Sequence, residues 1–211
     1  MSFECCDGVN PRFPLILSEQ IQQFDLYLGN SQFETHETWR NLYQLSLSFE
    51  DCWKKESLVA LFSDTSLTFK NLSELKFRYY NSQKIDDQQF EKLAYEIGTN
   101  LGNLTRLELS FSNFRLLGSE SILSLSRMIC SKLKKLHHLN LTFFRESDES
   151  YSKSFCGADI LYLANRITSK LENLESLTLN FNNSVDRKEM KRKSLLDELC
   201  SLIHQNSTKL K

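Results

Sequence analysis

Apolar and polar residues alternate in a short pattern that recurs along the chain. The clearest copies read NLYQLSLSF, NLSELKFRY, NLTRLELSF, KLHHLNLTF and NLESLTLNF, and they begin at residues 41, 71, 103, 135 and 173. A weaker copy, IQQFDLYL, begins at residue 21. Alternation with a period of two is typical of a β-strand that buries one face. The sequence therefore predicts six strands that are copies of one repeating unit.

The segments between the strands carry apolar residues at helical spacing. The clearest set has offsets of 0, 3, 4, 7 and 11 residues: Phe90, Leu93, Ala94, Ile97 and Leu101. Such offsets fall on one face of an α-helix. Residues 160–171 repeat this spacing, and residues 58–69 and 122–133 follow it with one polar exception each. In each case the first leucine of the next strand follows three residues after the last helical position, so strands and helices should alternate in one frame.

The two periodicities together resemble a leucine-rich repeat protein of the ribonuclease-inhibitor-like class. The first leucines of the five clear copies stand at positions 42, 72, 104, 136 and 174, which leaves room for a full helix in each unit. The resemblance covers about residues 21–211. It implies an α/β solenoid, a horseshoe of about six repeats with a parallel β-sheet on the concave face and α-helices on the convex face. Residues 1–20 would then be an N-terminal segment or cap, and residues 21–211 the repeat domain.

The chain departs from the repeat pattern at one position. The asparagine that usually ends the motif L-x-x-L-x-L-x-x-N occurs clearly only at Asn182. The other copies hold different residues there: Glu50, Tyr80, Ser112 and Phe144. This argues against a continuous asparagine ladder in the turns. We expect the apolar residue that ends each strand to hold the bend instead: Phe49, Tyr79, Phe111, Phe143 and Phe181.

Alternation along the strands also predicts which side chains face outward. Leu107, Leu109 and Phe111 should point inward, whereas Arg106 and Glu108 should lie on the concave face. Charged residues gather in the third and fourth copies, beside polar residues of the fifth. Our candidate partner-binding residues are Glu74, Lys76, Arg78, Arg106, Glu108, His138 and Asn140. The alternative is that these charges only pair across the sheet and keep the surface soluble.

Two loops are longer than the others and form a second candidate surface. Residues 145–155, RESDESYSKSF, are serine-rich and mildly acidic, and residues 186–194, DRKEMKRKS, are basic. Insertions in repeat proteins often lie on a binding edge. The alternative is that both loops are tolerated bulges, because lengthening a loop costs little free energy.

Overall charge and chemistry add few further candidates. The 26 basic and 27 acidic residues nearly cancel, which argues against nucleic acid and an anionic membrane as partners. No close pair of the C-x-x-C kind occurs among the six cysteines, so we expect reduced thiols and no metal. The N-terminal segment resembles neither a secretory signal nor a membrane span, so we expect an intracellular and specifically cytoplasmic protein. No reaction motif is found. We therefore expect no cofactor and no enzymatic activity.

The end of the sequence suggests one further contact. The frame would open a seventh strand at position 213, but the sequence stops at Lys211. The strand LESLTLNF could therefore leave a sheet edge open to pairing with another chain. Alternatively, the last helix, at about residues 199–210, and the basic insertion at residues 187–193 cover that edge.

A non-catalytic protein-protein interaction scaffold is the function that this pattern favours. It would bind a protein partner through the concave sheet face and the adjacent loops. Two alternatives stay open: a constitutive structural subunit of a larger assembly and, less favoured, an RNA-binding repeat protein.

Overall fold

One parallel β-sheet organises the protein. The computed structural model describes residues 2–5, 13–14, 22–28, 33–34, 37–49, 62, 69–145, 154–182, 184, 197 and 201. The strands of the sheet follow one another in chain order: β1 (Ser2–Cys5), β3 (Gln23–Leu28), β5 (Gln44–Phe49), β6 (Glu74–Tyr79), β7 (Arg106–Ser112), β8 (His138–Phe144) and β9 (Ser176–Asn180). Every neighbouring pair is parallel. The six strands predicted from the repeat are therefore confirmed, and β1 adds a further strand beside the first copy.

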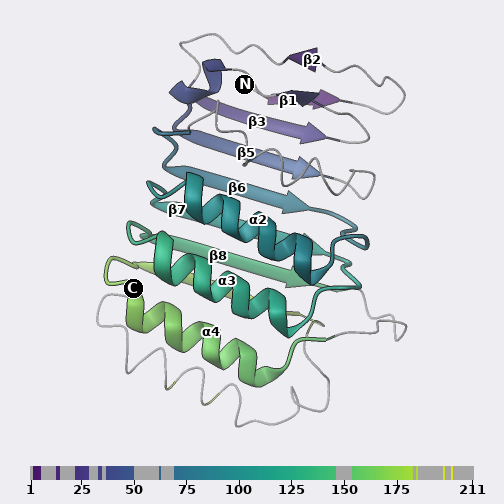
Figure 1. Cartoon of the computed structure of the whole chain (residues 1–211), viewed down its shortest axis with the longest axis vertical. Helices are drawn as coiled ribbons and strands as arrows, with labels where there is room; N and C mark the ends of the chain where they lie inside the picture. The colour runs from purple at the N-terminus through teal and green to yellow at the C-terminus, as the bar shows by residue number, and fades with distance from the viewer. Residues whose placement is uncertain are drawn as a thin grey trace.

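In the described part of the chain, three α-helices lie side by side on one face of this sheet (Figure 1). They are α2 (Asp87–Asn100), α3 (Ser119–Lys132) and α4 (Gly157–Lys170), and each connects two successive strands. Their bounds confirm the α/β order predicted from the apolar spacing. The helices expected at residues 58–69 and 199–210 lie largely outside the described residues. A short parallel pair, β2 (Phe13–Pro14) with β4 (Phe33–Glu34), and the 3-10 helix η1 (Glu37–Asn41) complete the elements of the described residues.

Neighbouring units help to form each other's helices. Asp86 begins α2 with a capping box, in which its carboxylate accepts from the Gln89 backbone N–H and the Gln89 side chain accepts from the Asp86 N–H. Gly118 begins α3 and has no side chain to cap it. Instead, Oδ1 of Asp87 accepts from the Gly118 N–H at 2.8 Å and from the Ser121 hydroxyl at 2.5 Å. A carboxylate of α2 is therefore hydrogen-bonded to the N-cap residue of α3 and to a side chain of its first turn.

Equivalent positions of successive repeat copies pair directly with each other, so the register is the same between all neighbouring strands of the repeat. Leu75, Leu107, Leu139 and Leu177 stand opposite one another, and so do the polar residues beside them. The first three leucines are fully buried, whereas Leu177 is only partly buried. One outward position departs from the sequence prediction, because Ser46 is buried rather than exposed. Its side chain is short, and the residues opposite it in the neighbouring strands are the longer Asp25 and Lys76.

Aromatic rings form a row of contacts along the ends of the strands. Consecutive ring centroids lie between 5.3 and 6.5 Å apart in the series Phe49, Tyr79, Phe111, Phe143 and Phe181. The last two contacts are stacked, with interplanar angles of 13° and 6°. Phe90 of α2 packs against Phe111 at 5.1 Å, so the row also holds the helix layer. The residues expected to hold the bend thus contact one another from copy to copy, and their role in the bend stays a prediction.

Asparagines do occur after the strands, one residue later than the family pattern suggests. Asn81 and Asn113 both adopt left-handed backbone conformations, with φ values of 50° and 53°. Asparagine tolerates this region better than most residues. Nδ2 of Asn113 donates to Oδ1 of Asn81 at 3.0 Å. Arg145 occupies the equivalent position of the next copy, so this asparagine row stops there.

Candidate interaction surface

The sheet face opposite α2, α3 and α4 presents polar side chains. We call this surface, formed by the outward side chains of β5 to β9, the open face. Along β7 the burial alternates, with Leu107, Leu109 and Phe111 buried and Arg106 exposed. On β9 the outward residues Ser176, Thr178 and Asn180 are all exposed. The outward residues of β6 and β8 are half-buried, so the face predicted to bind a partner is partly to fully exposed from β6 to β9.

Two ion pairs join β6 and β7 at the centre of the open face. Both Nε and one terminal nitrogen of Arg78 donate to Oε1 of Glu108, at 3.0 and 2.7 Å. Arg106 and Glu74 stand directly opposite each other, with 3.6 Å between Nε and Oε2. The first pair is diagonal, because the residue opposite Glu108 is Lys76. Both ion pairs cross from one strand to the next. The alternative interpretation of these charges, in which they only pair across the sheet, predicts such contacts.

These two ion pairs involve two of the three lysine and arginine residues among the predicted partner-binding residues. Lys76 makes no ion pair within the described part of the chain, because its opposite carboxylate is held by Arg78. The paired guanidinium groups are also the more accessible partners. The side chains of Arg78 and Arg106 are 36% and 45% exposed, against 21% and 27% for their carboxylate partners. The centre of the open face therefore presents nitrogen donors to solvent, while its carboxylates lie deeper.

The two remaining predicted residues extend the cluster onto β8. His138 stands opposite Arg106, and Asn140 stands opposite Glu108. Oδ1 of Asn140 accepts from the Thr142 hydroxyl at 3.3 Å, and both residues are half-buried. All seven residues predicted from the sequence thus lie on three adjacent strands. Their role in binding stays a prediction.

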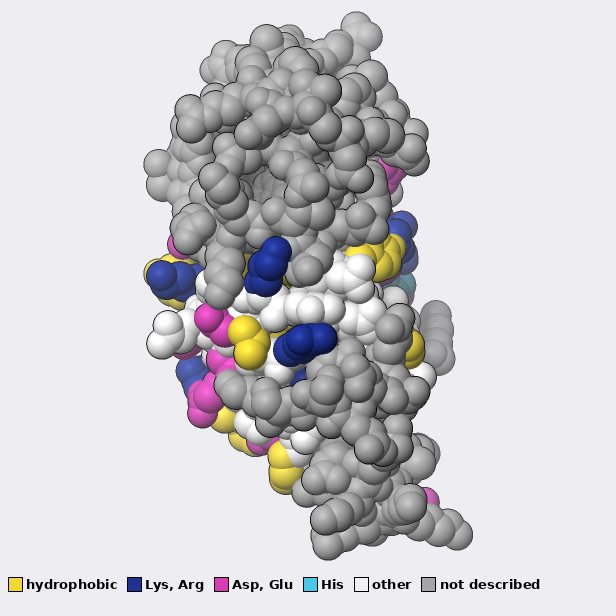
Figure 2. All heavy atoms as spheres, turned by 90° about the vertical axis from the view of Figure 1, so that its right-hand side faces the viewer, with side chains coloured by type: hydrophobic (Ala, Val, Ile, Leu, Met, Phe, Trp, Pro, Cys, Tyr) yellow, Lys and Arg dark blue, Asp and Glu magenta, His cyan; other side chains and the backbone are white. Residues whose placement is uncertain are grey.

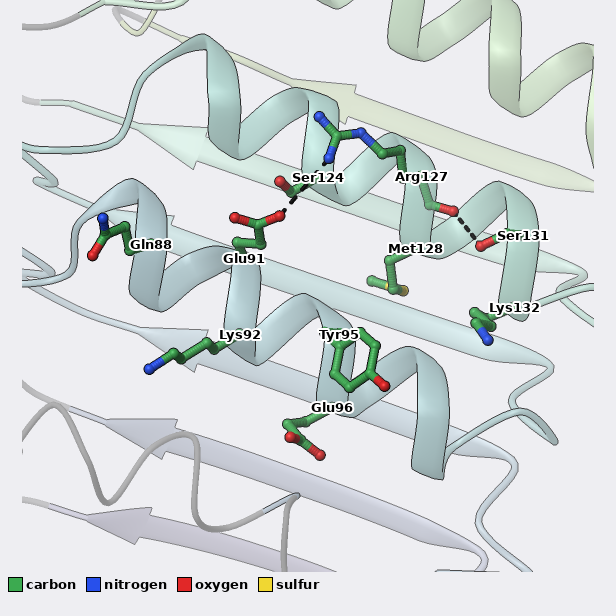
Figure 3. A pocket seen from close by; sticks show the side chains of 10 residues that line it. All are labelled: Gln88, Glu91, Lys92, Tyr95, Glu96, Ser124, Arg127, Met128, Ser131 and Lys132. Carbon is green, nitrogen blue, oxygen red and sulfur yellow. Dashed lines mark hydrogen bonds and ion pairs between the residues drawn. The ribbon is translucent and has the colours of Figure 1, made fainter.

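A groove between α2 and α3 was not predicted from the sequence (Figure 3). It has a volume of about 850 Å³, and its lining includes Glu91, Tyr95, Arg127 and Met128. Arg127 of α3 reaches Glu91 of α2 at 3.8 Å, and the Tyr95 side chain projects from α2 beside the groove. Tyr95 is 61% exposed. The sequence signal for this groove is Tyr95 itself, a large aromatic residue that lies outside the apolar face of the predicted helix.

The edge at which the strands end shows no single chemical character. Figure 2 faces this edge, and basic, acidic and apolar side chains are interspersed over its described part. Lys84 and Arg115, from the loops after β6 and β7, are exposed. The two enlarged loops fall mainly on residues 146–153 and 187–193, which lie outside the described residues.

Thiols and metal-ligating groups give no reactive cluster in the described residues. No group of three or more His, Cys, Asp and Glu side chains there could hold a metal ion. Cys130 is buried in α3, and this burial raises the pKa of its thiol, although the Arg166 guanidinium opposes the shift. Within the same residues, the helices are too short or too polar to cross a membrane.

A scan against protein-family models finds no match, and a search of curated protein sequences finds none either. The function of this chain is therefore inferred from the repeat, its register and its surfaces.

Proposed function

We propose that this chain is a leucine-rich-repeat-like solenoid that serves as a non-catalytic protein-protein interaction scaffold. The open face would be the concave side of the array and would bind a protein partner, with the adjacent loops contributing further contacts. Two observations support the architecture: the strand pattern recurs in the sequence, and each copy pairs with the next in parallel and in constant register. Repeat arrays of this kind usually act through an extended surface.

The open face carries the functional proposal. Its outward positions form straight columns across the strands, such as Lys76, Glu108, Asn140 and Thr178. A rigid sheet presents each column at fixed spacing, so a partner meets a preorganised surface and loses little free energy to ordering it. Exposed arginines at the centre of the surface are favourable anchors, because guanidinium groups make several directed hydrogen bonds.

The test compares protein capture by the full chain with capture by surface variants. Ser110→Arg with Thr142→Arg places two long charged side chains on the open face without touching the buried leucines. Gln88→Arg with Thr99→Arg adds the same charge to exposed positions of α2. Circular dichroism should show that both variants keep the fold. We expect a specific protein to be captured by the wild type and the α2 variant, and to be lost from the open-face variant.

Equal capture by all three proteins would contradict the proposal, because the open face would then not be the contact. Retention of nucleic acid that falls steeply with salt, without a specific protein, would favour the RNA-binding alternative instead.

A further inference from the structure

A second surface follows the edge where each helix turns into the next strand, on the left in Figure 1. Asparagine side chains join these turns from copy to copy. Asn71 donates to the Arg40 carbonyl at 3.1 Å, Asn103 to the Lys70 carbonyl at 2.9 Å, and Asn173 to the Lys134 carbonyl at 3.3 Å. These bonds hold the turns in contact along the sheet. Side chains that project from them therefore form a continuous row.

This row is strongly basic. Five of its residues are basic and exposed: Arg40, Lys70, Lys132, Lys134 and Lys135. We call these five residues the basic edge. No acidic residue occurs in the turn segments 39–43, 69–73, 101–105 and 132–137. The chain as a whole has a net charge of -1, so the charge is concentrated here by position and not by composition.

Helix stability alone does not require these cations. Basic residues at helix ends can interact with the partial negative charge of the last carbonyl groups. However, α2 has no basic residue in its last turn, and Gly102 and Asn103 follow its C-cap. The helix nevertheless closes as the other two do, with the C-cap N–H bonded to the Ile97 carbonyl. The cations of the neighbouring turns are therefore available for another purpose.

The basic edge is also not neutralised internally. Within the described residues none of its five members makes an ion pair. Lys135 donates to Oδ1 of Asn103 at 2.7 Å, a neutral acceptor that fixes its direction without cancelling its charge. The row ends at the turn before β9, where Glu172 and Glu175 bring acidic groups.

We propose that the basic edge binds an acidic polypeptide segment. Adjacent strands lie about 4.8 Å apart, so the turns before β5 to β8 extend over roughly 15 Å. An extended peptide covers that length with about five residues, and its carboxylates could meet the cations of the turns before β5, β6 and β8.

The aromatic residues of these turns favour a peptide over single-stranded nucleic acid, which normally adds base stacking to phosphate contacts. Trp39 and Phe69 are buried, and Tyr43 is half-buried with its hydroxyl bonded to the Gln23 side chain at 2.7 Å. An exposed apolar anchor for a membrane surface is likewise absent from the described turns. The basic edge therefore offers charge without a stacking platform.

This inference concerns a different surface from the open face and stands apart from the function proposed above. The measurement is the fluorescence anisotropy of a labelled oligoglutamate peptide titrated with the full chain. The test variant is Lys70→Glu with Lys134→Glu. The control is Lys92→Glu with Arg115→Glu, which makes the same change in net charge at exposed positions away from the edge. Circular dichroism confirms that each variant is folded.

We expect the edge variant to bind the peptide about tenfold more weakly or worse, and the control to change the affinity by less than about twofold. Binding should also weaken as salt rises. Equal losses in the two variants, or affinity independent of salt, would overturn the proposal. A labelled oligothymidylate and phosphatidylserine vesicles serve as rival probes. Tighter binding of either than of oligoglutamate, with the same dependence on Lys70 and Lys134, would assign the edge to that class of partner and overturn the peptide assignment.

Discussion

Arg78 of β6 donates two hydrogen bonds to a single carboxylate oxygen of Glu108 on β7, although Lys76 is the residue directly opposite Glu108. The guanidinium is the more exposed member of the pair. A solvent-exposed pair of this kind contributes little to folding. Its exposed nitrogen atoms can still contact a partner, where the surrounding water would be removed and the interaction strengthened.

Replacement of Arg78 and Arg106 by alanine should therefore separate binding from stability. We expect binding of the captured protein to weaken by about 2 kcal/mol or more, and the free energy of unfolding to change by no more than about 1 kcal/mol for each pair. Titration calorimetry and urea denaturation measure the two quantities. An unchanged affinity would mean that the ion pairs serve only the surface of the sheet.

Close packing of α2 on α3 gives a prediction about Gly98. A Cβ atom at this position would lie 2.6 Å from Cγ of Met128 and 3.3 Å from Cβ of Lys132. Gly98→Leu should therefore destabilise the fold by about 1 to 3 kcal/mol through overpacking, even though leucine favours a helix more than glycine does. Thr99→Leu, at the adjacent exposed position, is the control and should have little effect. A stable Gly98→Leu variant would show that the two helices can separate at low cost.

The hydrogen bonds between Asp87 of α2 and the start of α3 can be tested by substitution. Asp87→Ala should lower the free energy of unfolding by about 0.5 to 2 kcal/mol, because the Gly118 N–H and the Ser121 hydroxyl lose their acceptor. Glu91→Ala removes a carboxylate one turn later, at an exposed site, and should cost less. Thermal denaturation of the two variants measures the difference. Equal losses would argue against capping between units.

Cys130 and Cys156 should differ in reactivity. Cys130 is buried and its thiol pKa is raised, so at neutral pH it stays protonated and inaccessible, whereas Cys156 is half-exposed. Alkylation followed by peptide mass spectrometry should label Cys156 well before Cys130. The folded state binds the Cys130 proton more tightly than the unfolded state does. Its contribution to stability is therefore present below the thiol pKa of the unfolded chain and is lost as pH rises through the higher folded value. Rapid labelling of Cys130 in the folded protein would contradict the burial.

The sheet and helix order could be predicted from the sequence because two periodicities repeat in it. Leu107 and Leu109 must share a face once β7 is a strand, and the equal spacing of the other copies determines the register of the columns. The repeat pattern alone therefore places all seven candidate residues on adjacent strands. The burial of Ser46 does not follow from this pattern, because it depends on neighbours in other strands, which alternation along one strand does not describe.

Other features depend on distances between units and have no local signal. Glu108 pairs with Arg78, which lies diagonally across the sheet, and not with Lys76, which stands directly opposite. This preference follows from the reach and donor geometry of arginine. The asparagine of the fourth copy stands at Asn113, one residue beyond the position that the family pattern indicates. The basic edge consists of turns that are far apart in the sequence. Its continuity depends on the hydrogen bonds of Asn71 and Asn103 between these turns, which the sequence pattern does not indicate.

Site-specific photo-crosslinking tests the central claim most directly, because it reports contact with the open face itself. Benzoylphenylalanine placed at Ser110 would project from the middle of β7 on this face, and the same residue placed at Tyr162, an exposed position of α4, is the control. We predict that irradiation in a native extract joins one specific protein to the Ser110 variant and not to the Tyr162 variant, and that Ser48→Arg with Thr142→Arg in the same chain abolishes the product. Crosslinking of a specific protein only from α4, or an open-face product that survives these substitutions, would contradict the assignment of the open face as the binding surface.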